Sequence, residues 1–251
     1  MKTALRSDIG RIRLVNEDRG WSEILEPGFV VAIVADGMGG HQAGDVASRL
    51  AVDTFREALQ GSTAALSTEE RRTLMSQAIL QANEVVFDTA SNNEQYHNMG
   101  TTVVAALLSD DRAVIGHIGD SRAYQWREGK LKQLTEDHTL VNELVKSGQI
   151  TPEEAEHHPR RNVLTRALGT DEQVEVDIRD IAWEKDDILL LCSDGLSNMI
   201  GAAEMAETLA EDGLDLNQKA DRLVQLALQA GGDDNITVAL LHHAEDTELE
   251  G

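Results

Sequence analysis

The chain has 251 residues, of which 41% are hydrophobic and 27% are charged, and its formal net charge is −23. A negative field of this size repels phosphate backbones and anionic membrane surfaces, so it excludes nucleic acid as a partner. No apolar stretch approaches the roughly 20 residues of a membrane span, and the composition predicts a soluble globular protein without membrane insertion.

The start of the chain and its cysteine content bear on location. Residues 1–10 lack the apolar segment and small-residue cleavage site of a secretory signal. Cys192 is the only cysteine, so the chain forms no internal disulfide and no thiolate metal cage. These features predict a cytoplasmic protein. The carboxylate-rich segments 204–215 and 244–251 are interpreted as solvated surface, the second as an acidic tail.

Apolar periodicity predicts the main elements in chain order. Strand-length apolar runs rich in β-branched residues occupy 29–35, 102–108, 113–118, 188–192 and 236–241. Helical i, i+3, i+4 spacing occupies 44–59, 68–90 and 219–230, with Asp45 and Ser67 as candidate caps. No internal repeat or proline-rich linker interrupts the chain, which predicts one domain.

The middle of the chain has the pattern of β-hairpins. Segments 113–118, 123–126 and 131–134 follow one another through tight turns that contain glycine, so we expect antiparallel pairing between them. Helices in two blocks beside such hairpins indicate α+β layers rather than a doubly wound parallel sheet.

An aspartate stands at four strand ends. Asp36, Asp120 and Asp194 follow predicted strands, and Asp234 precedes the last one. For any single site, an Asp-Gly pair that merely opens a turn is the better interpretation, because glycine tolerates positive φ. Four such sites together predict that strand ends of one sheet converge on a rim, where the carboxylates would repel one another unless cations lie between them.

The ligand type indicates which cations these would be. Oxygen ligands without cysteine or paired histidine favour Mg²⁺ or Mn²⁺ over Zn²⁺, and Ca²⁺ stays possible on ligand type alone. Two ions bridged by one carboxylate and a water generate a hydroxide near neutral pH and clamp the oxygens of an in-line displacement. The pattern is therefore typical of a hydrolase.

These residues lie in motifs that resemble the type 2C, metal-dependent (PPM) protein serine/threonine phosphatases, especially their compact bacterial members. The motifs follow in family order over about 7–241, and they are RLVNED (13–18), ADGMGGH (35–41), MGTT (99–102), GHIGDSR (116–122), LTEDHT (134–139), SDG (193–195) and GDDN (232–235). The resemblance implies a four-layer α/β/β/α sandwich of two antiparallel sheets flanked by helices, with metals in a cleft at one end. It implies a phosphatase domain over 1–243 that includes a flap subdomain at about 141–169.

The resemblance also implies roles for individual residues. Asp36 would bridge two core ions, the carbonyl of Gly37 would bind one of them, and Asp194 and Asp234 would complete the core. Asp120, together with Asp194, would hold a weaker third ion.

Three further residues near the motif starts receive roles from the same resemblance. Asp18, with Glu17 beside it, would hold metal-bound waters. Arg13 would grip the substrate phosphate, and a planar guanidinium suits that task, although taken alone it reads as a surface arginine. His41 is the candidate general acid, with metal-bound water as the alternative, because Met38 stands where some relatives have a histidine directly after Asp-Gly.

Other conspicuous residues receive no catalytic role. His138 is expected to fix local structure by hydrogen bonding, and His117 to be a satisfied core or face residue. Cys192 is expected to pack in a strand, since Asn198 stands where a cysteine-dependent phosphatase needs arginine. A dinucleotide-binding loop is excluded because Gln42 replaces its third glycine.

The flap carries a basic cluster formed by Arg160, Arg161 and Arg166. Its arginines would either help to select phosphoprotein substrates or simply balance nearby glutamates, which are Glu153, Glu154 and Glu156. Both interpretations stay open on the sequence.

The predicted activity is hydrolysis of phosphoserine and phosphothreonine monoesters on proteins by attack of a metal-bridging hydroxide. The protein would act as a monomer and counteract a bacterial serine/threonine kinase. One alternative is a catalytically silent regulatory module that binds phosphoproteins on the same scaffold. A second alternative is a non-enzymatic Ca²⁺-binding module.

Overall fold

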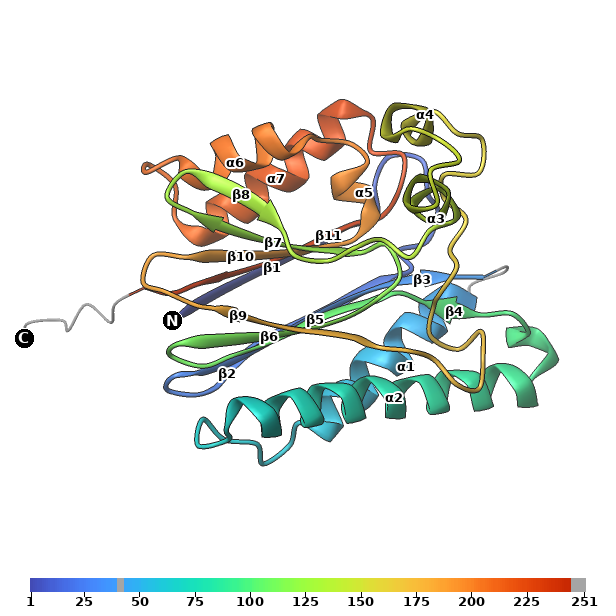
Figure 1. Cartoon of the computed structure of the whole chain (residues 1–251), viewed down its shortest axis with the longest axis horizontal. Helices are drawn as coiled ribbons and strands as arrows, with labels where there is room; N and C mark the ends of the chain where they lie inside the picture. Colours follow the sequence, from blue (N-terminus) through green and yellow to red (C-terminus); the bar gives the residue numbers. More distant parts are fainter. Residues whose placement is uncertain (40–42, 245–251) are drawn as a thin grey trace, which may run out of the picture.

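The computed structural model describes residues 1–39 and 43–244. Two antiparallel β-sheets pack face to face, and helices cover both outer faces (Figure 1). One outer layer consists of α1 (Ala43–Ala58) and α2 (Thr68–Asn92), followed by the short η1 (Glu94–Tyr96). The other consists of α5 (Asp194–Ser197), α6 (Ala202–Ala210) and α7 (Leu216–Ala230). The predicted four-layer α/β/β/α sandwich is confirmed.

Each sheet has its most apolar strands in the middle. The six-stranded sheet has the order β2 (Asp18–Glu26), β3 (Phe29–Met38), β5 (Val103–Leu108), β6 (Arg112–Ile118), β9 (Asp177–Ala182), and β4 (Gly100–Thr101) pairs with β3. The five-stranded sheet has the order β1 (Lys2–Asp8), β11 (Ile236–His242), β10 (Ile188–Cys192), β7 (Arg122–Arg127), β8 (Lys130–Gln133).

Alternation along β3 shows why its sequence is a continuous apolar run. Val30, Ala32 and Val34 pack between the two sheets, whereas Val31 and Ile33 pack against α1 and α2. Both faces of the strand are therefore dry, and each large aliphatic side chain buried in this way stabilises the fold by about 1.5–3 kcal/mol. This core fixes the strand ends where the candidate site lies.

The hairpin predicted between 113–118 and 123–126 is wrong. The strands β6 and β7 belong to different sheets, and the chain crosses from one sheet to the other through residues 119–121. Gly119 has φ 110°, which allows the chain to turn out of the sheet. The second predicted hairpin is confirmed, because β7 pairs with β8 through a turn with positive φ at Glu128 and Gly129.

Four strands, two α-helices and one 3₁₀ turn had no counterpart in the sequence prediction: β1, β2, β4, β9, α5, α6 and η1. The predicted helices α1, α2 and α7 are present, each within about three residues of its expected bounds. Ser67 caps α2 in a reciprocal capping box with Glu70, whereas Asp45 lies inside the first turn of α1 and pairs with Arg19.

The segment 141–169 consists largely of turns with two short helices, α3 (Leu140–Lys146) and α4 (Pro152–Glu156), as expected. We call this segment the flap. It projects from one end of the sandwich, at the upper right of Figure 1. The acidic tail expected at 244–251 lies almost wholly outside the described residues, which end at 244.

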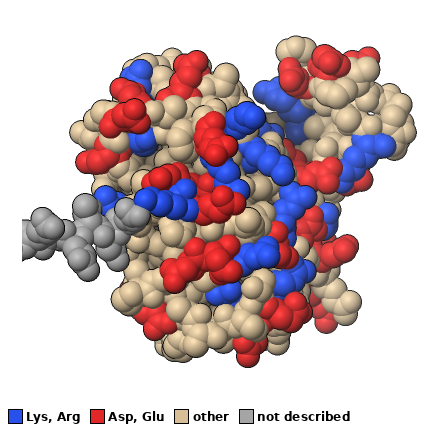
Figure 2. Space-filling model, turned by 60° about the vertical axis from the view of Figure 1, so that its left-hand side comes forward, with Lys and Arg blue, Asp and Glu red and all other residues tan. Residues whose placement is uncertain are grey.

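The surface carries both signs of charge despite the formal net charge of −23. Figure 2 shows Lys and Arg side chains interleaved with Asp and Glu over one face. Within the described ranges, every helix is too short or too polar to cross a membrane.

Candidate metal centre

Aspartates from both sheets meet at the end of the sandwich that faces the flap. Asp36 is near the end of β3 in one sheet, Asp194 follows β10 in the other, and Asp234 precedes β11. Asp120 lies in the crossing between the sheets. The convergence was expected within a single sheet and that part is wrong, because two packed sheets bring their strand ends to a common edge. We call this end of the sandwich the rim.

The rim aspartates repel one another. Loss of solvent raises the pKa of Asp36 well above its ordinary value, and four other carboxylates add to this shift, those of Asp18, Asp194, Asp120 and Asp234. The same loss of solvent raises the pKa of Asp194, and the negative charge of Asp234 raises it further. Burial likewise raises the pKa of Asp18 and of Asp120 to about 7 each. Divalent cations between these groups would relieve the repulsion.

The two Asp-Gly pairs on the rim are not turns. Gly37 lies within β3 and Gly195 within α5, and neither has a φ in the left-handed region. A Cβ on Gly37 would lie 2.0 Å from the carbonyl oxygen of Gly44, and a Cβ on Gly195 would lie 2.0 Å from that of Asn235. Glycine is required because another backbone passes too closely for any side chain.

Asp18 is fully buried behind the rim and opposite Asp36 in the β2–β3 register. The hydroxyl of Ser193 donates to its Oδ2 at 2.7 Å and accepts from the Thr237 amide at 2.9 Å. The other carboxylate oxygen, Oδ1, is buried and has no hydrogen-bond partner among the described residues. An orphaned carboxylate oxygen beside clustered carboxylates fits a hard divalent cation or the water it carries.

Arg13 lies on the loop between β1 and β2, beside the rim. Its Nη2 donates to Asp234 Oδ2 at 2.6 Å, and its side chain is 48% exposed. Glu17, on the same loop, is partly buried, and this raises the pKa of its carboxyl. The guanidinium therefore sits against a rim carboxylate with an open side toward solvent.

Asn235 and Thr102 received no role from the sequence, but their hydrogen bonds fix the backbone around the rim aspartates. Asn235 Nδ2 donates to the carbonyls of Ile9 at 2.8 Å and Val15 at 3.0 Å, and its Oδ1 accepts from the Glu17 amide at 2.8 Å. The loop that carries Arg13 is thus fastened to the residue after Asp234. The only signal in the sequence is the place of Asn235 within GDDN.

Thr102 is the second such residue, and it connects two rim aspartates. Its hydroxyl accepts from the Asp36 amide at 3.0 Å and shares a hydrogen bond of 2.7 Å with the hydroxyl of Ser121. Because Ser121 follows Asp120 in the chain, Thr102 is hydrogen-bonded both to Asp36 and to the neighbour of Asp120. This gives the MGTT motif a structural purpose.

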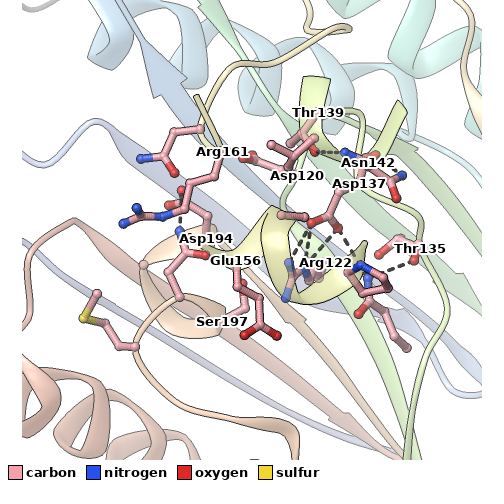
Figure 3. A pocket seen from close by; sticks show the side chains of 18 of the residues that line it. Asp120, Arg122, Thr135, Asp137, Thr139, Asn142, Glu156, Arg161, Asp194 and Ser197 are labelled. Atoms are coloured by element: carbon pink, nitrogen blue, oxygen red, sulfur yellow. Dashed lines mark hydrogen bonds and ion pairs between the residues drawn. The ribbon is translucent and has the colours of Figure 1, made fainter. Parts of the chain in front are cut away.

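A cleft of about 930 Å³ separates the rim from the flap. Its rim wall includes Asp120, Asp194 and Asp234, and its flap wall includes Asn142 and Arg161. Figure 3 shows Asp120 and Asp194 on this cleft, with Arg122 bonded to Asp137 beside them. The cleft is large enough for a polypeptide segment rather than a small ion alone.

Of the remaining sequence candidates, His41 lies outside the described residues. His138 does form structural hydrogen bonds, as predicted. The prediction that His117 is satisfied is wrong, since neither of its ring nitrogens has a partner in the described part of the chain. Cys192 is buried in β10 as expected, and burial raises the pKa of its thiol to about 12.

The two-sheet fold and the carboxylate cluster at its rim define a hydrolase of the divalent-cation-dependent class. Comparison with known proteins gives the family: a sequence profile described as protein phosphatase 2C matches residues 11–232. The chain therefore belongs to the protein phosphatase 2C family.

Individual relatives are similar over nearly their whole length. The serine/threonine phosphatase stp of Listeria monocytogenes is 45% identical over 241 residues, which are 96% of this chain and 95% of that protein. The structure of the Streptococcus agalactiae serine/threonine phosphatase matches with TM-score 0.89 and 38% identity, covering 95% of this chain and 98% of that one. The catalytic domain of the phosphatase PstP, solved with two manganese ions, matches with TM-score 0.82 and 34% identity over 95% and 96% of the two chains.

Proposed function

We propose that the protein hydrolyses phosphoserine and phosphothreonine monoesters on other proteins. The observation that carries the proposal is the convergence of Asp36, Asp120, Asp194 and Asp234, of which the last three line a wide cleft, with Arg13 bonded to Asp234. Relatives with 39–45% identity over almost the whole chain carry the name of serine/threonine or protein phosphatase. The protein is a metal-dependent serine/threonine phosphatase, not a silent binding module.

The residues of the rim suit two Mn²⁺ or Mg²⁺ ions, since all their side-chain donors are oxygen. Asp36 would bridge both ions, the Gly37 carbonyl would bind one, and Asp194 and Asp234 would complete the core. When bound, such a pair of ions activates water and clamps the oxygens of an in-line displacement at phosphorus. Asp120 and Asp194, which share the cleft wall, would hold a weaker third ion.

Arg13 would bind the phosphate of the substrate. Its guanidinium already bonds a carboxylate oxygen of Asp234, which is the geometry in which it would bond a phosphate oxygen. The arginine would therefore exchange one anionic partner for another when substrate enters. Asp18 and Glu17 would orient water next to the core, and Asp18 has the buried, unpaired oxygen for this task within the described structure. His41 as proton donor to the leaving group stays a prediction.

The flap would contact the protein part of the substrate. Arg161 lines the cleft, and neither Arg160 nor Arg161 forms a direct ion pair with another residue of the described structure. The third arginine, Arg166, is already paired with Asp177 at 2.9 Å. Arg161 is thus the flap cation best placed to bind an anionic group of a phosphoprotein.

The substrate implies a partner enzyme, because a phosphoserine or phosphothreonine is made by a serine/threonine kinase. We propose that the protein opposes such a kinase and acts as a cytoplasmic monomer. The single buried cysteine suits a reducing compartment.

Phosphate release from a phosphothreonine peptide tests the proposal. We expect turnover in Mn²⁺, loss of turnover with EDTA, and loss in Asp36→Ala and Asp194→Ala, with Asp233→Ala as the matched control because Asp233 is an exposed neighbour. Full activity of Asp36→Ala would contradict the mechanism. Binding of the peptide without turnover would instead support the silent module. A chromogenic phosphomonoester with Mn²⁺ separates an enzyme from a Ca²⁺-binding module.

A further inference from the structure

A cluster of side chains that has no role in the proposed chemistry lies just behind Asp120. It consists of His117 on β6, His138 in the LTEDHT motif and Asp177 on β9. His117 and Asp177 are cross-strand partners, and the rings of the two histidines lie 4.6 Å apart between centroids. Both histidines are buried, whereas the side chain of Asp177 is 46% exposed. One ligand-type atom from each residue lies within 4.8 Å of the others.

The hydrogen bonds of His138 argue against a metal ion in this cluster. The Gly119 amide donates to its Nδ1 at 3.0 Å, and its Nε2 faces Asp177 Oδ2 at 3.3 Å. Burial lowers the pKa of His138, and an Nδ1 that accepts a hydrogen bond carries no proton. Because Nδ1 accepts, the one ring proton must be on Nε2, where it is donated to Asp177. Nε2 therefore has no lone pair for a cation.

The same bonds show what His138 holds. Besides the ring contact, the His138 amide donates to the Gly119 carbonyl at 2.8 Å, so both backbone polar groups of Gly119 are bonded to one residue. Gly119 is the left-handed residue of the crossing between the sheets, and a Cβ there would lie 2.6 Å from Thr102. The next residue is Asp120. His138 thus fixes the backbone from which that carboxylate projects.

His138 is also bonded to the flap. Its carbonyl accepts from the Thr165 amide at 2.8 Å. The carboxylate of Asp177, which accepts from the ring, also accepts from Arg166 Nη1 at 2.9 Å through its other oxygen. A continuous set of hydrogen bonds therefore runs from the last part of the flap through Asp177 and His138 to the residue before Asp120.

We propose that His138 is a positioning residue that sets Asp120 for the weaker third divalent ion and connects that site to the flap through Asp177 and Arg166. The inference rests on the proposed role of Asp120 as a ligand of that ion. Residues that orient a metal ligand from behind change metal affinity about 10–100-fold when they are replaced. The consequence of losing His138 is a higher Mn²⁺ requirement with an intact core site.

Three replacements of His138 separate its two ring contacts. In His138→Asn the amide oxygen occupies the place of Nδ1 and can accept from Gly119. In His138→Gln the amide nitrogen occupies the place of Nε2 and can donate to Asp177, but nothing accepts from Gly119. His138→Leu keeps apolar bulk and loses both contacts.

The measurement is activity of the full-length enzyme on a chromogenic phosphomonoester as a function of Mn²⁺ concentration. We expect the concentration for half-maximal activity to rise about tenfold in the Gln and Leu variants, with kcat regained at saturating Mn²⁺, and to stay near wild type in the Asn variant. Calorimetric affinity for the tightly bound ions should not change. Equal behaviour of the Asn and Leu variants, or equal weakening of the tight ions, would overturn the inference.

The variant Asp120→Ala tests the proposed third-ion role of Asp120 separately from the positioning role of His138. If Asp120→Ala leaves the Mn²⁺ dependence unchanged, the third-ion role itself fails. If Asp120→Ala removes the dependence of activity on the weakly bound Mn²⁺ while His138→Leu leaves that dependence unchanged, the third-ion site is supported and the positioning role of His138 is contradicted. In the double variant, His138→Leu should add nothing to Asp120→Ala.

A second pair of variants tests the flap connection without disturbing the buried histidines. Arg166→Gln removes the cation bonded to Asp177, and Arg160→Gln removes an equal charge nearby that forms no ion pair within the described structure. We expect the Mn²⁺ requirement to rise about threefold only in Arg166→Gln, a modest coupling between sites. An equal rise of the Mn²⁺ requirement in both variants would show that net charge alone causes the effect, and it would overturn the proposed link between the flap and Asp120.

Discussion

The rim and the flap face each other across one cleft, yet they are built on different principles. Rim side chains stand at the ends of packed strands, and Asp18 and Ser193 behind them are almost completely buried. Flap cations stand on short helices and turns, and Arg160 and Arg161 are exposed. Under the proposed function, the chemistry that is the same for every substrate would rest on the buried part, and the contacts that differ between substrates would rest on the exposed part.

The largest effect should come from disturbing rim geometry alone. Gly195→Ala places a Cβ 2.0 Å from the Asn235 carbonyl oxygen, so Asp194 and Asp234 must move apart. We expect about a hundredfold loss of kcat/KM on every phosphoester and a loss of about 1–3 kcal/mol of stability.

The matched control for that change is Gly213→Ala, since no described atom lies within 4 Å of a Cβ at Gly213. Steady-state kinetics on a small phosphoester and on a phosphopeptide, with urea unfolding, measure both variants. A Gly195→Ala enzyme with normal activity would show that the rim tolerates movement.

Arg13 bonds the rim carboxylate of Asp234, and its loss should be the next largest effect. Arg13→Ala would remove the proposed charge-assisted bond to phosphate, so we expect about a tenfold or greater fall in kcat/KM on small and protein substrates alike. Arg11→Ala is the control, because Arg11 is an exposed arginine on the same loop. A loss confined to protein substrates would assign Arg13 to the same task as the flap.

The repulsion within the rim should appear as a pH-dependent stability of the metal-free protein. Burial raises the pKa of Asp120 from 3.8 to about 7, so the folded chain holds a proton that the unfolded chain has released. Stability should therefore fall as pH rises from about 4 to about 7. His117 acts in the opposite sense below pH 6.5, because burial lowers its pKa to about 3.

Comparison with Asp120→Asn isolates the carboxylate from this opposing contribution. When the pH falls from 8 to 6, the free energy of unfolding of the wild type should rise by about 1 kcal/mol relative to that of the variant, measured by urea unfolding in EDTA. Saturating Mn²⁺ should abolish the gain, since bound ions favour the ionised carboxylate. An identical pH profile in the two proteins would show that burial does not raise the pKa of Asp120.

The smallest effect should come from the flap. Arg161→Ala should raise KM for a phosphoprotein about threefold and leave kcat/KM for a small phosphoester unchanged, because only the larger substrate reaches the flap wall. Arg160→Ala, a neighbouring exposed arginine outside the cleft lining, is the control. A similar loss on both kinds of substrate would place Arg161 in the chemistry rather than in recognition.

The sequence by itself determined the central strands and the long helices. Strands β3, β5, β6, β10 and β11 are buried on both faces, so each is a nearly continuous apolar run. The edge strands β1, β2 and β9 have half-exposed faces and mixed composition, and they carry no such signal. The rim aspartates were also apparent, because a carboxylate at the end of a buried strand is conspicuous.

Only the tertiary structure decided how these pieces meet. Strand length and tight turns did not reveal that β6 and β7 lie in different sheets, since pairing partners are chosen by packing at a distance. Nor did the Asp-Gly pairs reveal that Gly37 and Gly195 admit a passing backbone instead of forming turns. The same reason hides the role of His138, because its partners Gly119, Thr165 and Asp177 are remote in sequence and become adjacent only in the folded protein.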